Sequence, residues 1–120
     1  MVDLEETGDL MVLRYLGPPE PGDEAAYLDA LEQVGARSAP FALILVLGGI
    51  GKLSAAAERA QAVWFKRTRA DLDRRCRGLV IVRPGFEEAS ADVFRRLWTF
   101  PIAIAPDEAA ARTTVRTYLA

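Results

Sequence analysis

The sequence predicts a single α/β domain over residues 1–120, with a mixed or mainly parallel sheet of about four to five strands flanked by about four helices. Three consecutive segments support this prediction: an apolar run at 41–47, an amphipathic stretch from about Ser54 to Arg77, and a second apolar run at 79–82. Two strands joined by a helix of this length are expected to be parallel neighbours. A length of 120 residues is typical of one hydrophobic core.

The segment before this unit predicts a strand, a loop and a helix. Leu10–Leu16 is rich in Val, Leu and Tyr and indicates a strand, which we expect to pair with residues near Leu4. Prolines at 18, 19 and 21 exclude a helix or a central strand and predict a loop. Asp23 is a typical N-cap residue, so we expect a helix from about Glu24 to Val34, ended by Gly35.

The central and C-terminal segments predict the remaining elements. The run at 41–47 lacks alternation, which is typical of a strand covered on both faces. The helix after it has an expected inward stripe of Ala57, Ala60, Trp64, Phe65, Thr68, Leu72 and Cys76. Further along, the pattern predicts a turn at 84–86 and a helix from Ser90 or Ala91 to Leu97. A strand at 100–105 and a last helix from Asp107 or Pro106 to Leu119 follow.

Composition excludes several classes of function. The chain has no histidine, which excludes Ser-His-Asp and Cys-His catalysis and histidine-based zinc sites. It carries 15 basic and 17 acidic residues, so no domain-wide basic excess points to nucleic acid. No apolar run is long enough to span a membrane, and the acidic start lacks a signal-peptide core. We therefore expect a cytoplasmic protein that is not an enzyme, with no cofactor and no metal.

The glycine loop between the first apolar run and the long helix has two interpretations. In the loop of Gly48, Gly49, Gly51 and Lys52, the pair Gly51-Lys52 fits the end of a P-loop. Leu53 stands where a P-loop needs Ser or Thr, and Val46 stands where it needs its first glycine. The loop therefore predicts either a turn that ends with Ser54 as the helix N-cap, or an anion or nucleotide site at the helix N-terminus.

The outer face of the long helix is the second candidate surface. Helical spacing places Arg59, Val63, Lys66, Arg67 and Arg74 on this face. Charge is also uneven along the chain: residues 1–32 contain nine acids and one base, whereas residues 54–77 contain seven bases and three acids. The face is either a solvated charged surface or a protein-docking or anion-binding surface. The asymmetry favours pairing of acidic and basic surfaces within the molecule or between copies.

The order and spacing of five segments resemble a known family. These segments are Leu16-Gly17-Pro18, Arg37-Ser38-Ala39-Pro40-Phe41, the passage from Arg59 through Trp64 and Leu72 to Cys76-Arg77-Gly78, Phe94 to Trp98, and Asp107-Glu108-Ala109-Ala110. Together they are similar to small bacterial STAS-like proteins, relatives of anti-sigma-factor antagonists (SpoIIAA-like), over nearly the whole chain. The resemblance implies a domain that binds partner proteins, sometimes switched by serine phosphorylation at the start of the second helix. The nearby hydroxyl here is that of Ser54.

These observations predict a non-enzymatic regulatory or adaptor domain that acts through protein–protein interaction. The expected docking residues are Gly48, Gly49, Gly51, Lys52, Ser54 and Arg59, with Val63, Lys66, Arg67 and Arg74 as a secondary surface. Two alternatives stay open. One is a nucleotide- or small-anion-binding domain that uses the loop at 48–54. The other is a self-associating structural protein, for example a homodimer.

Overall fold

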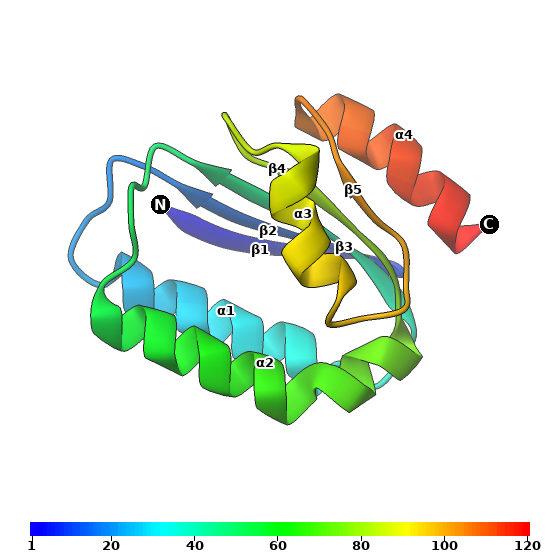
Figure 1. Ribbon diagram of the computed structural model, residues 1–120, viewed down its shortest axis with the longest axis horizontal. Helices are drawn as coiled ribbons and strands as arrows, with labels where there is room; N and C mark the ends of the chain where they lie inside the picture. The colour runs from blue at the N-terminus through cyan, green and yellow to red at the C-terminus, as the bar shows by residue number, and fades with distance from the viewer.

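The computed structural model describes residues 1–120 and contains one sheet with helices on both faces (Figure 1). The elements in chain order are β1 (Val2–Thr7), β2 (Leu10–Leu16), α1 (Asp23–Ala36), β3 (Phe41–Gly48), α2 (Ala55–Arg75), β4 (Cys76–Val82), α3 (Glu88–Arg95), β5 (Ile102–Ile104) and α4 (Glu108–Leu119). None of these helices combines the length and the hydropathy that crossing a membrane requires.

The strands lie in the sheet in the same order as in the chain, β1-β2-β3-β4-β5. β1 is antiparallel to β2, with Leu4 opposite Leu13, which confirms the expected pairing near Leu4. β2, β3, β4 and β5 are parallel to one another. The predicted fold class, a mainly parallel α/β domain, is therefore confirmed. Because the strands are parallel, the loops after β2, β3, β4 and β5 leave the sheet at one edge.

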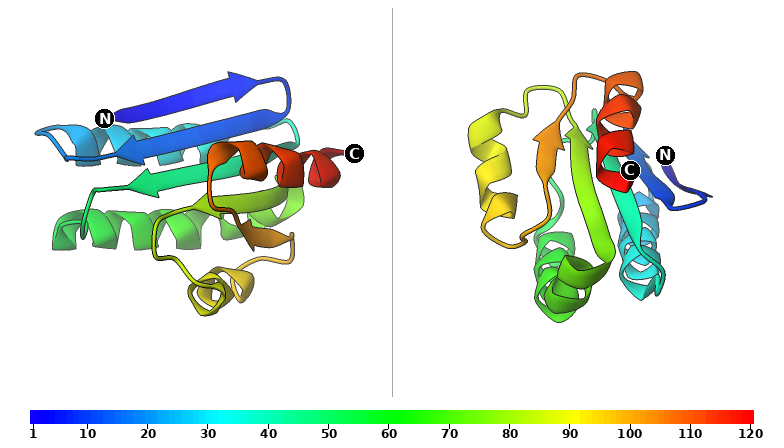
Figure 2. Two further views of the ribbon diagram at one scale, coloured as in Figure 1. Left: turned by 90° about the horizontal axis from the view of Figure 1, so that it is seen from above. Right: turned by 90° about the vertical axis from the view of Figure 1, so that its right-hand side faces the viewer.

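Helices cover both faces of the sheet, which gives the fold three layers (Figure 2). α1, α2 and α3 contribute to one core cluster together with β2, β3 and β4. α4 lies on the opposite face, where Ala111 and Val115 pack in a second cluster with Val12, Ile44 and Val80. Both faces of β3 are therefore covered, which explains its continuous apolar sequence.

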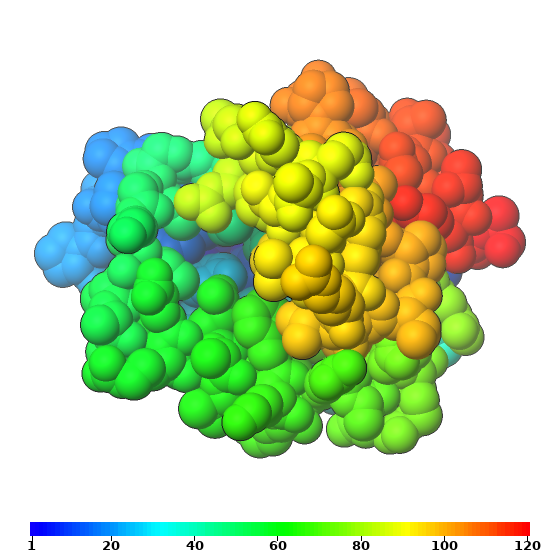
Figure 3. All heavy atoms as spheres, viewed as in Figure 1, coloured from blue at the N-terminus to red at the C-terminus, as the bar shows by residue number.

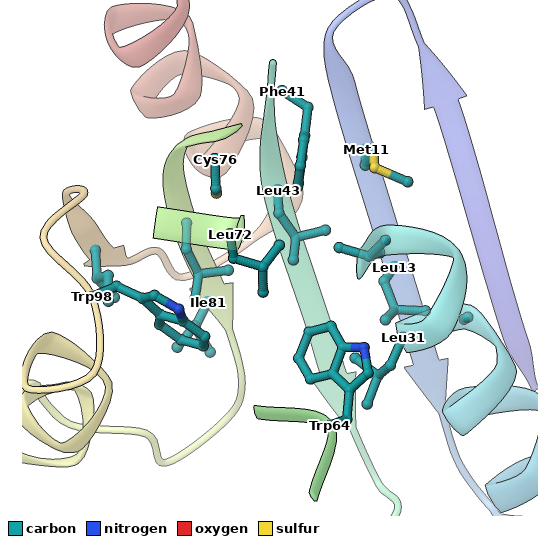
Figure 4. Packing of buried hydrophobic residues seen from close by; sticks show 14 of the residues in the cluster. Met11, Leu13, Leu31, Phe41, Leu43, Trp64, Leu72, Cys76, Ile81 and Trp98 are labelled. Carbon is teal, nitrogen blue, oxygen red and sulfur yellow. The ribbon is translucent and has the colours of Figure 1, made fainter. Parts of the chain in front are cut away.

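Trp64 is the largest residue that α2 contributes to the first cluster (Figure 4). It is 4% exposed, as its place in the inward stripe predicts. The ring of Phe65 continues this packing toward α3, with centroid separations of 6.1 Å to Phe94 and 5.5 Å to Trp98. Two members of the predicted stripe behave differently. Ala60 is exposed, and Cys76 is buried as the first residue of β4 instead of the last turn of α2.

Several predicted boundaries were wrong. Asp23 is not the N-cap of α1 but its first residue, and its carboxylate accepts hydrogen bonds from the N-terminal ammonium and from the Glu20 backbone N–H. Gly35 does not end α1, which continues to Ala36. A side chain at position 35 would meet Trp64 Nε1 at 3.0 Å, so this glycine serves close packing of α1 against α2. α3 begins earlier than expected, at Glu88, and β5 is shorter.

Gly78 stands between the amphipathic stretch and the apolar run at 79–82 in the sequence. In the structure it lies within β4. A Cβ at position 78 would sit 2.2 Å from the Tyr118 ring of α4. The absence of a side chain therefore lets α4 pack closely on β4.

Arg14 of β2 links the β1–β2 hairpin to α4 through ion pairs. Its guanidinium forms ion pairs with Asp3 at 2.8 Å, Glu5 at 3.1 Å and Glu108 at 2.6 Å. The hydrogen bond from Arg14 lowers the pKa of Glu108, and hydrogen bonds from Arg14 and Arg112 lower the pKa of Glu5. Residues about one hundred positions apart are thereby held together.

Candidate functional site

The loops after β2 and β3 meet at the carboxyl edge of the sheet, where the glycine loop was predicted to act. The Gly17 backbone N–H donates a hydrogen bond to the Gly48 carbonyl oxygen at 2.7 Å. A Cβ on Gly17 would lie 1.7 Å from the Gly49 carbonyl oxygen, so only glycine permits this approach. Gly49 and Gly51 also have positive φ angles of 66° and 65°. Gly17, Gly49 and Gly51 are therefore required as glycines in this turn, whereas Gly48 contributes its backbone carbonyl oxygen.

Ser54 is the N-cap of α2, as the sequence predicts. Its hydroxyl oxygen accepts a hydrogen bond from the Ala57 backbone N–H at 3.1 Å. The same hydroxyl donates to one oxygen of the Glu24 carboxylate at 2.8 Å, and the Ser54 backbone N–H donates to the other at 2.7 Å. Two groups that an external phosphate would use are thus engaged with a carboxylate of the same chain.

Lys52 and Arg59, the two cations of the predicted docking site, lie at different hollows of the surface. Lys52 lines a cavity beneath the glycine loop, whereas Arg59 lines a groove on the outer side of α2. The six residues of the predicted primary site therefore divide into a packed turn, a satisfied helix cap and two separately placed cations.

We call the first hollow the β3–β4 cavity (Figure 3). It has a volume of about 210 Å³ and lies at the carboxyl ends of β3 and β4, between α2 and α3. It is lined by Tyr27, Leu45, Leu47, Ile50, Gly51, Lys52, Leu53, Glu58, Gln61, Phe65, Arg83 and Phe94. The cavity combines an apolar wall with two cations, Lys52 and Arg83, and one carboxylate, Glu58.

Tyr27 is the buried polar group of this cavity. Its hydroxyl donates a hydrogen bond to Gln61 Oε1 at 2.7 Å. Burial raises the pKa of Tyr27 to about 12, and the positive charge of Arg83 opposes this shift. Tyr27 therefore stays a neutral hydrogen-bond donor at physiological pH, within reach of the field of Arg83.

We call the second hollow the α2 groove. It runs between α2 and the end of α3 and is lined by Arg59, Ala62, Val63, Phe65, Lys66, Arg69 and Leu97. Val63 is 62% exposed in the middle of a helix. Arg69 Nε donates a hydrogen bond to the Leu97 carbonyl oxygen at 2.7 Å, which joins the two walls. The three charged residues of this groove are all cations.

The predicted secondary surface is divided as well. Val63 and Lys66 line the α2 groove. Arg67 is paired with Glu32 of α1, and Arg74 is paired with Asp71 of its own helix. Arg67 and Arg74 therefore have ion-pair partners within the chain. Val63 and Lys66, which form no ion pair, are the members of the predicted secondary surface that line the α2 groove.

The single thiol does not add a reactive group to either hollow. Cys76 is buried, and its Sγ lies 3.3 Å from the Gly78 carbonyl oxygen. Burial raises the pKa of Cys76 to about 12, so the thiolate form is scarce at neutral pH. No group of three acidic or thiol side chains is placed to hold a metal ion.

Three important residues were missed at the sequence level: Glu24, Arg83 and Leu97. Arg83 could have been found, because it directly follows the buried strand at 79–82 and so lies at the carboxyl edge of a parallel sheet. Glu24 and Leu97 carry no such local signal, since each meets α2 only through the tertiary fold.

Comparison with known proteins finds no family model, no curated protein and no solved structure that matches this chain. The STAS-like resemblance therefore stays a prediction from the sequence.

Proposed function

We propose that this protein is a non-enzymatic regulatory or adaptor domain that binds an acidic, partly apolar segment of a partner protein in the α2 groove. The observation that carries the proposal is the composition of this groove: an exposed valine flanked by cations, with no acid in the lining. The STAS-like resemblance implies the same class of function, a domain that works by binding other proteins.

The apolar part of the proposed surface is unusual for a solvated helix. Val63 and Val93 are 62% and 58% exposed, and only Met1 joins them among large hydrophobic side chains that are this exposed. Phe65 and Leu97 are half-buried in the same groove as Val63. Covering these side chains with an apolar segment would release water from them, which is the main driving force of protein association.

The cations of the α2 groove determine the charge that we expect of the partner segment. Arg59 and Lys66 form no ion pair and no side-chain hydrogen bond within the chain. Two free cations beside an apolar strip favour an acidic segment and speed its encounter. Binding should weaken with salt, because exposed charges are screened over about 10 Å at about 0.1 M ionic strength.

The two alternatives from the sequence receive less support. The anion-binding interpretation of the glycine loop is weakened by Glu24, which already accepts two hydrogen bonds from Ser54. Self-association is favoured by one observation, the nine acids and one base within residues 1–32. These acids would give the groove an acidic partner surface on a second copy, so the experiment must separate the two cases.

A photo-crosslinking amino acid at position 63 tests the proposal directly. Expressed in the source cell, this variant should form crosslinks to a peptide of net negative charge, identified by mass spectrometry. The matched control places the same amino acid at Thr113, which is exposed on α4 at the opposite face. Crosslinks between two copies of the chain would assign self-association in place of an adaptor function.

Charge reversal gives the second arm of this test. Arg59→Glu with Lys66→Glu should abolish the crosslinks and leave the melting temperature nearly unchanged, because both side chains are exposed. The control reverses two other exposed cations, Arg77 and Arg116, which lie outside the groove. Lys52→Glu tests the loop separately. Crosslinks that survive the Arg59 and Lys66 reversal would exclude the groove as the docking surface.

A further inference from the structure

We propose that the β3–β4 cavity binds a small apolar monocarboxylate, such as an arylacetic acid. This site is separate from the α2 groove, with which it shares only Phe65. It is also distinct from the helix N-cap at Ser54, which does not line the cavity. The inference therefore does not depend on the proposed docking function.

One wall of the cavity is the carboxyl-terminal end of β3, which the helices on that face of the sheet cover incompletely. Phe41, Leu43, Leu45 and Leu47 alternate along β3 toward the face that α1 and α2 cover. Phe41 and Leu43 are buried, whereas Leu45 and Leu47 are half-exposed because they form the cavity wall. The exposed apolar wall thus lies at the carboxyl end of parallel strands, where ligands of open α/β sheets bind.

The volume limits the size of the ligand. A cavity of about 150 Å³ accommodates benzene. The β3–β4 cavity, at about 210 Å³, therefore has space for one aromatic ring and a short substituent. A complete nucleotide is too large to be enclosed, which separates this proposal from nucleotide binding at the glycine loop.

The charges of the lining select a monoanion. Lys52 and Arg83 take part in no ion pair and no side-chain hydrogen bond within the chain. A guanidinium such as that of Arg83 can hold a carboxylate through two parallel hydrogen bonds. With Glu58 the three charged groups sum to one positive charge, which matches one carboxylate and disfavours a dianion.

Neutral polar groups are also available to the ligand. Gln61 Oε1 accepts the hydrogen bond from the Tyr27 hydroxyl, and the amide nitrogen of Gln61 donates no hydrogen bond within the chain. This nitrogen supplies two N–H donors in the lining of the cavity. A carboxylate in the cavity would therefore meet donors from Gln61 as well as the two cations.

The test is a titration of the ¹⁵N-labelled full chain with phenylacetate, followed by two-dimensional NMR. Saturable shifts are expected for the backbone amides of Leu47, Gly51 and Phe94, which line the cavity and not the α2 groove. Phenylacetamide, the neutral analogue, should bind at least about tenfold more weakly because it lacks the charge that the cations recognise. Phenyl phosphate should also bind more weakly than phenylacetate.

Arg83→Gln should weaken phenylacetate binding at least about tenfold. Because Arg83 is exposed, this change should leave the fold intact, as an unchanged melting temperature would verify. Arg116→Gln is the matched control, an exposed arginine on α4 away from the cavity, and should leave binding unchanged.

Four outcomes would overturn the proposal. The first is the absence of a saturable shift up to about 10 mM phenylacetate, which would mean a dissociation constant above about 10 mM. The second is equal binding of phenylacetamide. The third is an equal loss of affinity in Arg116→Gln. The fourth is tighter binding of phenyl phosphate, which would assign the cavity to phosphate monoesters instead.

Discussion

The Glu24 carboxylate accepts hydrogen bonds from both the backbone N–H and the hydroxyl of Ser54, at 2.7 and 2.8 Å. Glu24 lies in the first turn of α1, and Ser54 is the N-cap of α2. One carboxylate is therefore placed near the N-termini of two neighbouring helices, where negative charge is favourable. The two hydrogen bonds from Ser54 lower the pKa of Glu24.

Ser54→Ala should destabilise the fold by about 1 kcal/mol, because it removes the hydrogen bond to the Ala57 N–H and one donor to Glu24. Urea denaturation measures this change. Ser38→Ala, at an exposed loop serine, is the control. Glu24→Gln should cost less stability in the Ser54→Ala background than in the wild type. Additive effects of the two substitutions would show that the pair is not coupled.

Trp64→Ala should destabilise the fold by about 3–5 kcal/mol, because it removes a large buried side chain and leaves a cavity. Since small domains are marginally stable, we expect the variant to be largely unfolded at room temperature, which circular dichroism detects. Val63→Ala, at the neighbouring exposed position, should have little effect on stability. Wild-type stability of Trp64→Ala would contradict the inward orientation of the indole ring.

Gly78→Ala should destabilise the protein by about 1–3 kcal/mol, because its Cβ would overlap the Tyr118 ring of α4. Gly48→Ala is the matched control within a strand: its Cβ would meet the nearest atoms at 3.6 and 3.9 Å, ordinary contact distances. Thermal denaturation should rank the two variants accordingly. If Gly78→Ala is as stable as Gly48→Ala, α4 does not pack on β4 as described.

Arg14→Met should flatten the acid limb of the stability profile. Glu5 and Glu108 have pKa values lowered from 4.5 in the folded state, by hydrogen bonds to Arg14 above all. Their contribution to stability is therefore present above pH 4.5 and is lost as the pH falls through the lower, folded-state values. The stability difference between wild type and variant should be largest near neutrality and shrink below pH 4.5. Urea denaturation across this range, with Arg116→Met as control, measures the difference.

The strands and the long helix could be predicted because their signals are local. The apolar runs of β3 and β4 need no tertiary context, and the sequence Ser54-Ala55-Ala56-Ala57 combines a cap residue with strong helix formers. The burial of Trp64 follows from helical spacing alone. These features are the ones that the structure confirms.

Residues that act through a distant partner could not be predicted. The carboxylate of Asp23 is drawn to the N-terminal ammonium, which β1 places beside it, and so does not cap α1. Gly35 and Gly78 lie within elements because of Trp64 and Tyr118, although glycine usually indicates a helix end or a turn.

The candidate site shows the same limit. Lys52 and Arg83 are 31 positions apart and meet at one cavity only because β3 and β4 are adjacent and parallel. Lys52 could be predicted as a site residue because it follows the glycines of the loop, whereas no comparable motif surrounds Arg83. A rule that collects charged residues from the loops that follow buried strands would have found both.

The sequential strand order has a consequence for biosynthesis. Each new strand pairs with the strand made just before it, so the sheet can grow while the ribosome is still translating the chain. α4 follows all five strands in the chain, and it is the helix that covers the apolar face formed by Val12, Ile44 and Val80. A nascent chain in which α4 has not yet docked therefore has a formed sheet with one apolar face exposed to water, which favours aggregation. Protection by a chaperone is most needed in the interval between the formation of the sheet and the docking of α4.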